Sequence, residues 1–254
     1  MSEKPIYSEA RKRRLFWRVG LILAMFVVCM IVLFWLYTAT MLVYPRDVAC
    51  LNQLSQLGMA CLMSAAADDD KLPPAYTTDN NGKPLHNWRV LILSWIDRDL
   101  YKKIRLDEPW DSEYNSQFHD QMPSIYACPS VMDLSERKRY ASYAMIVGDG
   151  AIPEGPERLN WSDVKDGRKN TILLVETKKK IPWMKPEDLS MDELAQGVAC
   201  GQKEGTGVGS RHPKRVSCVM MDGTMLALDL KTSVETLKAM ATYAGGEEVT
   251  IPNE

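Results

Sequence analysis

The stretch "VGLILAMFVVCMIVLFWLYTATMLV", Val19–Val43, contains no charged residue and decides the first part of the fold. An α-helix rises ~1.5 Å per residue, so this run is long enough to cross a hydrocarbon core of ~30 Å. Trp17, Trp35 and Tyr44 lie near its ends, where aromatic side chains are typical of a membrane interface. The stretch therefore predicts a transmembrane helix over residues 19–44.

Basic residues flank this stretch on its N-terminal side. Before it lie Lys4, Arg11, Lys12, Arg13, Arg14 and Arg18, whereas Arg46 is the only Lys or Arg between Val19 and Asp70. Because segments rich in Lys and Arg stay in the cytoplasm, residues 1–18 are predicted to form a cytoplasmic tail. A cleavable signal peptide has a shorter apolar core followed by a small-residue cleavage site, so we expect a single-pass anchor retained in the inner membrane.

The remaining residues, 45–254, have the size of one extracytoplasmic domain. The whole chain is 46% hydrophobic and 25% charged, with a formal net charge of -2. These values exclude a disordered chain and give no sign of a surface for binding nucleic acid.

Two amphipathic helices are predicted after the span. Apolar residues recur every three or four positions at Leu51, Leu54, Leu57, Cys61, Leu62 and Ala65. Pro73 and Pro74 cannot continue that helix. The segment "LHNWRVLILSWIDRDLYKKI", 85–104, has the same helical spacing and predicts a second helix that packs on the first.

Strand patterns dominate the C-terminal half. The segments "YASYAMIVG" (140–148), "NTILLVET" (170–177) and "RVSCVMMDGTMLALDL" (215–230) are short β-prone runs, and Asp222-Gly223 predicts a tight hairpin turn within the last one. A closing helix is expected in "SVETLKAMATYAGG" (233–246), capped by Ser233. Helices, then a sheet, then a helix predict an α+β fold.

Several blocks resemble, in order, those of a bacterial pilin-like family called domain of unknown function 1559. "CLNQLSQLGMA" (50–60) resembles the family's C-x-N-x-L-x-Q-x-G segment. Three segments further along this chain resemble the family's later blocks: "IYACPS" (125–130), "SDVKDGRKNTILLVE" (162–176) and "IPWMKPEDL" (181–189). His212, Asp222 and Gly223 match its C-terminal signature, His-x9-Asp-Gly. The resemblance covers residues 50–246.

The resemblance implies a pilin-like fold, in which a long N-terminal helix, half of it in the membrane, packs on an antiparallel sheet. Relatives resemble pseudopilins of type II secretion, and no catalytic activity is implied. The family's usual prepilin peptidase site, Gly followed by Phe-Thr-Leu-x-Glu, is replaced here by "VGLILAMFVV" (19–28). We therefore expect no peptidase cleavage at Gly20.

Five cysteines follow the predicted span, in what would be an oxidising compartment: Cys50, Cys61, Cys128, Cys200 and Cys218. Their spacing leaves the pairing open. Cys50 and Cys128 both fall in blocks that resemble the family, and a bridge between them would tie the membrane-proximal helix to the "IYACPS" loop. On that ground we predict this pair.

Candidate metal ligands are sparse. The three histidines lie far apart without H-x-H or H-E-x-x-H spacing, and no Cys-x-x-Cys pair occurs, so zinc is not predicted. Asp163, Asp166 and Asn170 could supply hard oxygen ligands for calcium. The alternative is that these are ordinary turn residues before a strand. We expect no cofactor, with calcium as the alternative.

His212 is predicted to be structural. Pro213 removes a backbone donor at the start of the strand, which favours a loop or edge position for the histidine. From there the imidazole can contact a carboxylate such as Glu176, for which Arg89 is an alternative partner. No carboxylate pair has a spacing that demands acid/base catalysis, so no catalytic residue is assigned.

These features predict a non-enzymatic, membrane-anchored, pilin-like protein with a structural or interaction role in an envelope or secretion assembly. The alternative is an extracytoplasmic module that binds a polysaccharide or another solute, with aromatic residues such as Trp183 supplying contact area. The expected partners are the membrane and envelope or secretion proteins, and no nucleic acid.

Overall fold

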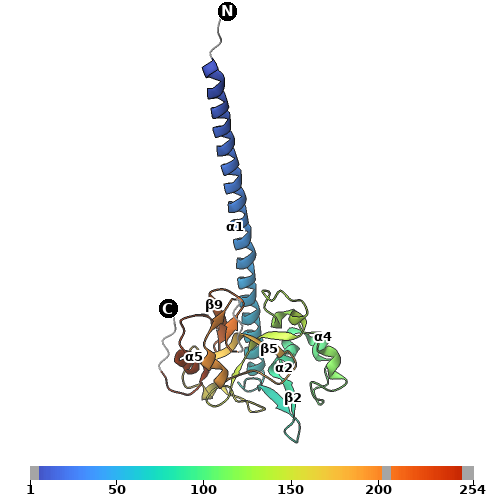
Figure 1. Cartoon of the computed structure of the whole chain (residues 1–254). Coiled ribbons are helices and arrows are strands. Elements are labelled where there is room, and N and C mark those ends of the chain that lie inside the picture. The colour runs from blue at the N-terminus through green and yellow to red at the C-terminus, as the bar shows by residue number, and fades with distance from the viewer. Residues whose placement is uncertain (1–5, 202–206, 248–254) are drawn as a thin grey trace, which may run out of the picture. The chain divides into compact units, whose positions relative to one another are not determined.

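The structure, a computed structural model, describes residues 6–201 and 207–247, and the chain divides into two compact units, Met1–Arg46 and Asp47–Glu254. Helix α1 spans Ile6–Ala66 (Figure 1). Within it, the span Arg13–Thr38 contains an 18-residue window with a mean hydropathy of 3.0, and it is long and apolar enough to cross a membrane, as an anchor or a signal sequence would be. Residues 1–5 of the predicted tail and 248–254 of the predicted domain lie outside the described residues.

The second unit is built around a four-stranded antiparallel sheet with the order β10-β9-β5-β3. The strands are β3 (Tyr140–Ala144), β5 (Ile172–Pro182), β9 (Arg215–Met220) and β10 (Met225–Asp229). The long strand β5 pairs with β3 on one side and β9 on the other, so that Glu176 lies opposite Tyr143, and Val175 opposite Cys218. β5 is therefore an inner strand of the sheet, paired along both of its edges.

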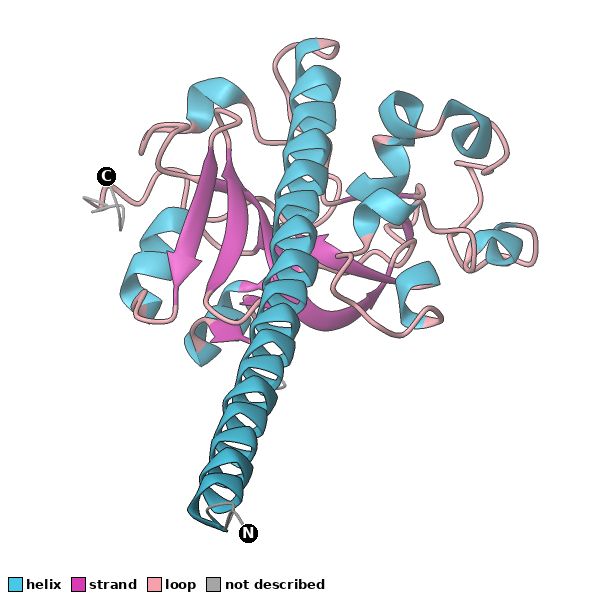
Figure 2. Cartoon of the chain, turned by 90° about the horizontal axis from the view of Figure 1, so that it is seen from above, coloured by secondary structure: helices cyan, strands magenta, loops and turns pink. Residues whose placement is uncertain are grey.

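The α1 residues that belong to the second unit pack on one face of this sheet (Figure 2). Leu54, Leu57 and Cys61 are fully buried at helical spacing. Gly58 permits the close approach, because a Cβ atom there would lie 2.8 Å from Cγ2 of Val219 on β9. The predicted apolar stripe of this helix is thus its contact with the sheet.

The opposite face of the sheet is covered by the C-terminal helix α5, Val234–Ala241. Side chains along β9 alternate between the two faces, since Val219 packs in the core under α1 while Val216 and Cys218 pack with Leu237 of α5. The Ser233 side chain accepts from the backbone N–H of Thr236 and caps α5, as predicted.

Short elements complete the unit. The paired strands are β1 (Tyr76–Thr78) with β2 (Pro84–Asn87), β4 (Ile146–Val147) with β6 (Leu189–Ser190), and β7 (Ala199–Cys200) with β8 (Gly209–Ser210). The short helices are α2 (Trp88–Leu91), α3 (Leu93–Ile96) and α4 (Arg98–Tyr101), and the 3-10 turns are η1 (Asn115–Phe118), η2 (Ser124–Tyr126), η3 (Glu136–Lys138), η4 (Trp161–Asp163) and η5 (Met191–Gln196).

The single helix predicted for residues 85–104 is instead a strand end followed by α2, α3 and α4. Asn87 caps α2, and Asp97, with φ −143° and ψ 85°, leaves the helical conformation and caps α4. The predicted α+β class is confirmed, because the long apolar N-terminal helix, the antiparallel sheet and the short C-terminal helix are all present.

Candidate functional site

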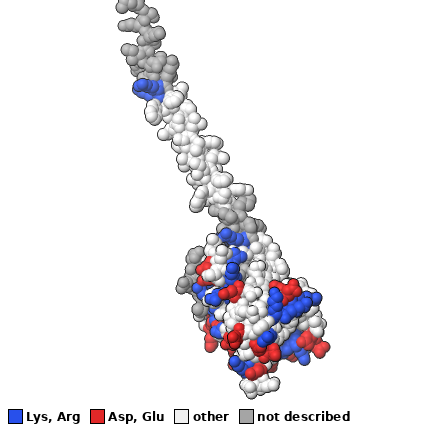
Figure 3. Space-filling view, turned by 90° about the vertical axis from the view of Figure 1, so that its right-hand side faces the viewer, with Lys and Arg blue, Asp and Glu red and all other residues white. Residues whose placement is uncertain are grey.

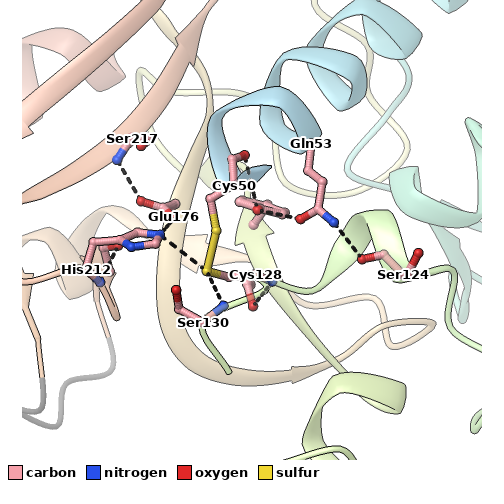
Figure 4. Close-up of a disulfide and its surroundings, with 11 residues drawn as sticks. Cys50, Gln53, Ser124, Cys128, Ser130, Glu176, His212 and Ser217 are labelled. Carbon is pink, nitrogen blue, oxygen red and sulfur yellow. Dashed lines mark hydrogen bonds and ion pairs between the residues drawn. A yellow bond between two sulfur atoms is a disulfide. The ribbon is translucent and has the colours of Figure 1, made fainter. Parts of the chain in front are cut away.

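A buried disulfide joins Cys50 of α1 to Cys128, which follows η2 (Figure 4). The two Cα atoms are 5.4 Å apart across a sequence separation of 78 residues. Both cysteines pack with Val131 in a small apolar cluster. The structure thus brings together the two cysteines that were predicted to pair.

His212 and Glu176 lie beside this disulfide. Nε2 of His212 is 3.5 Å from Sγ of Cys128 and 3.7 Å from Oε1 of Glu176. The four ligand-type atoms of Cys50, Cys128, Glu176 and His212 all lie within 4.8 Å of one another, and all four residues are buried. We call these four residues the Cys–Glu–His cluster.

Strands β5, β8 and β9 position Glu176 and His212 in this cluster. Glu176 follows the apolar run Ile172–Val175 on the central strand, and its Oε2 accepts a hydrogen bond of 2.8 Å from the backbone N–H of Ser217 on β9. The backbone N–H of His212 donates to Oγ of Ser210 at 3.1 Å. The first contact orients the Glu176 side chain, and the second holds the backbone at His212 (Figure 4).

The Cys128 side of the cluster is fixed by backbone donors. The backbone N–H of Cys128 donates to Oγ of Ser142 on β3 at 3.0 Å, and the N–H of Ser130 donates to Sγ of Cys128 at 3.4 Å. Cys50 is held by α1, and its carbonyl accepts from the hydroxyl of Tyr143 at 3.4 Å. The cluster is therefore a junction between α1, the sheet and the loop that carries Cys128.

This junction can act as a cross-link, and its donor atoms are of kinds that bind metals. Sulfur, imidazole nitrogen and carboxylate oxygen are the usual protein ligands of zinc. The side chains of His212 and Glu176 are only 6% and 2% exposed, so a substrate would have no direct path to them in this conformation.

The residues of the C-terminal signature are separated by strand β9. His212 precedes the strand, while Asp222 and Gly223 follow it. Six residues of strand span ~20 Å. Asp222 accepts from the backbone and hydroxyl of Thr224, and Gly223 has a φ of +88°, which the hairpin turn requires. The signature thus marks both ends of one strand and not one site.

The three predicted calcium ligands are engaged in hydrogen bonds within the protein. Asp163 closes a capping box with Asn160, and the carboxylate of Asp166 accepts from the backbone N–H groups of Gly245 and Gly246 at 2.7 and 2.8 Å. Asn170 donates its side-chain amide to the carbonyl of Asp166. The Asp163 and Asn170 contacts are those of turns, whereas Asp166 binds the backbone of a segment far along the chain. Calcium binding stays a prediction.

A second buried polar centre was not predicted from the sequence. Arg89 forms a 2.8 Å ion pair with Asp188, and its guanidinium also donates to the carbonyl of Tyr143. Asp188 also accepts from the indole N–H of Trp88 and from the backbone of Met145. Because Arg89 pairs with Asp188, His212 is the one of the two predicted alternatives that contacts Glu176. No spacing signal links residues this far apart in sequence.

An aromatic hollow of about 220 Å³ lies away from the cluster. Its lining includes the stacked rings of Trp110 and His119, whose centroids are 5.1 Å apart, together with Tyr140 and Arg139. Trp183 is only 1% exposed and donates its indole N–H to the carbonyl of His119, so it is packed into the core and offers little contact area itself.

A comparison with protein families found a match to the first part of the second unit. A family model described as "Protein of unknown function (DUF1559)" matches residues 45–151, a segment that contains Cys50 and Cys128. No curated protein and no solved structure matched the chain. Glu176 and the His-x9-Asp-Gly signature lie after the matched segment. The resemblance to domain of unknown function 1559 is therefore confirmed over residues 45–151 of this chain.

Proposed function

We propose that this protein is a pilin-like component of the inner membrane, with a cytoplasmic N-terminus and an extracytoplasmic domain that contributes structure or contacts to an envelope or secretion assembly. The family match and the apolar helix Arg13–Thr38 fit a membrane-anchored protein. The asymmetric basic flank before the helix supports the orientation.

The observation that carries the proposal is the disulfide between Cys50 and Cys128. Disulfides persist in oxidising compartments outside the cytoplasm, so this bond favours an extracytoplasmic location for the second unit. The bond also fastens the α1 residues of the second unit to the sheet-bearing part of that unit.

A non-enzymatic role is part of the proposal. The best-organised cluster of reactive side chains is buried, and its two sulfur atoms are bonded to each other. The face of the second unit in Figure 3 carries interspersed Lys, Arg, Asp and Glu side chains. Such mixed charge supports protein contacts over nucleic-acid binding.

Two measurements test location and processing. A C-terminal alkaline phosphatase fusion should be active, because that enzyme needs an oxidising compartment, whereas a matched fluorescent-protein fusion exported in the same way should be dark. Intact-mass analysis of the membrane fraction should find the N-terminal span retained. Inactive phosphatase, or loss of the residues up to Gly20, would reject the proposed topology.

The interaction role is tested by mild crosslinking in intact cells, followed by purification of the full-length protein. We expect secretion or envelope proteins to be enriched over a control with an unrelated single-pass anchor. Recovery of the same proteins with that control would count against a specific assembly.

A second candidate, a solute-binding module, is favoured by the aromatic hollow. The stacked pair of Trp110 and His119, with Arg139 beside it, could hold one sugar ring or a planar group. Its volume is below the ~300 Å³ of ordinary ligand pockets, which restricts it to small or partial ligands. A glycan array with the protein and Trp110→Ala should show binding that the variant loses. Equal signals would remove this candidate.

A further inference from the structure

We propose that the Cys–Glu–His cluster binds a zinc-class divalent cation when Cys50 and Cys128 are reduced. The disulfide and the metal site would then be two alternative states of the same buried junction. This inference does not depend on the proposed membrane or assembly role, because it concerns only residues inside the second unit.

The distances between the donor atoms fit one bound ion. In a tetrahedral zinc site with bonds of ~2.0 to 2.3 Å, neighbouring ligand atoms lie ~3.3 to 3.8 Å apart. Sγ of Cys128 is 3.5 Å from Nε2 of His212, and that nitrogen is 3.7 Å from Oε1 of Glu176. Two edges of a tetrahedron are thus already in place.

The fourth ligand is Sγ of Cys50, which lies within 4.8 Å of the other donor atoms. After reduction the two sulfur atoms must separate to ~3.7 Å, the edge expected for two thiolates on zinc. The Cα atoms are 5.4 Å apart, so rotation of the side chains can supply this separation without movement of the backbone.

Neighbouring groups donate hydrogen bonds to the ligand side chains of the cluster, as they do in protein metal sites. The backbone N–H of Ser217 binds Oε2 of Glu176 and turns Oε1 towards His212. The N–H of Ser130 points at Sγ of Cys128, where it would stabilise a thiolate. Such supporting hydrogen bonds orient ligands and tune metal affinity.

Charge also favours a cation in the reduced state. Two thiolates and one carboxylate would bring three negative charges into a buried site, and a divalent ion reduces that total to one. Without an ion, the thiols would stay protonated because burial of an unpaired charge is costly. The ion therefore compensates the charge of the ligands that it deprotonates.

The conversion between the two states transfers two electrons and two protons. A dithiol reductant gives two electrons and two protons to the Cys50–Cys128 bond, which becomes two thiols while the reductant becomes a disulfide. The divalent ion then forms two metal–sulfur bonds and displaces two protons. A disulfide oxidant reverses the sequence and releases the ion. In both states Cys50 remains tied to Cys128.

Co²⁺ titration of the purified full-length protein, without oxygen, tests the proposal. After treatment with a phosphine reductant, which delivers the same two electrons, we expect one equivalent of Co²⁺ to give the visible bands of tetrahedral coordination and a sulfur-to-cobalt charge-transfer band. Zn²⁺ should displace it. The oxidised protein, with the disulfide verified by mass, should give neither band.

Variants distinguish this site from adventitious binding. Glu176→Gln keeps the size of the side chain and should weaken Co²⁺ binding by at least about tenfold. His212→Ala should shift the visible bands, while Cys200→Ser, a matched change at a free cysteine, should bind as the unchanged protein does.

Three results would overturn the proposal, and none needs a variant to fold. They are a disulfide that stays intact in excess reductant, a reduced protein that gives no tetrahedral bands, and equal Co²⁺ binding by the reduced and oxidised forms.

Discussion

At the scale of single residues, the contact between His212 and Glu176 shows what the sequence could and could not predict. Pro213 placed the histidine at the start of a strand, and the apolar run before Glu176 indicated that its carboxylate is buried. The choice between Arg89 and His212 as its partner was open. It is decided by Asp188, which lies far from Arg89 in the sequence and binds it in the fold.

Replacing His212 by Ala should lower the free energy of unfolding by about 1 to 3 kcal/mol in the oxidised protein, because Glu176 would lose a partner in a buried position. Chemical denaturation of the solubilised protein measures this. The exposed neighbour Lys214 provides a control, since Lys214→Ala should change the value by less than about 0.5 kcal/mol. Equal effects of the two changes would show that the His212 contact contributes nothing.

The cysteines should differ sharply in reactivity. Burial raises the pKa of the Cys61 and Cys218 thiols well above the ordinary value, so they stay protonated and inaccessible at pH 8. Burial raises the pKa of Cys200 too, but its side chain is partly exposed. Maleimide labelling followed by peptide mapping should modify Cys200 first, and the other two only after unfolding.

The same labelling experiment reports on the disulfide. Without reductant, the Cys50 and Cys128 side chains should remain unmodified even in denaturant, because both sulfur atoms are bonded. Labelling of both cysteines under those conditions would mean that they are thiols in the isolated protein.

At the scale of secondary-structure elements, the sequence predicted those elements that depend on residues close together in the chain. The apolar stripe of α1, the hairpin of β9 and β10, and the cap of α5 each depend on residues close in sequence. The helix predicted for 85–104 failed because periodicity alone does not show that Asn87 and Asp97 take the chain out of helical geometry to cap short turns.

The packing of α1 on the sheet yields a test at Gly58. Alanine normally stabilises a helix interior by roughly 0.5 to 1 kcal/mol over glycine. Here the added methyl group would meet Val219 at 2.8 Å, so Gly58→Ala should instead destabilise the protein by about 1 to 3 kcal/mol.

A double-mutant cycle with Val219→Ala identifies the cause. Removing the valine methyl groups should recover much of the loss caused by Gly58→Ala, since the two positions are in direct contact. Thermal unfolding of the four proteins provides the measurement. Strictly additive effects would mean that α1 and β9 do not approach as closely as described.

At the scale of the whole molecule, the fold class followed from the order of the elements, but the Cys–Glu–His cluster did not. Its members come from α1, the loop after η2, strand β5 and the turn before β9, and no short motif connects them. A zinc prediction based on spacing was negative for this reason. Only the folded chain brings a histidine and a carboxylate to the predicted pair of cysteines.

The disulfide is expected to stabilise the second unit as a whole. It closes a loop across 78 residues, which restricts the unfolded chain by about 4 kcal/mol. Replacing both cysteines by Ala should therefore remove a large part of the ~5 to 15 kcal/mol that is typical of a domain. Denaturation is compared in the presence of a chelator, so that no metal ion can substitute for the bond. The Cys200→Ala variant is the control, because its thiol is free. A loss below about 1 kcal/mol would mean that α1 is held to the sheet by apolar packing alone, and that the cross-link has little structural role.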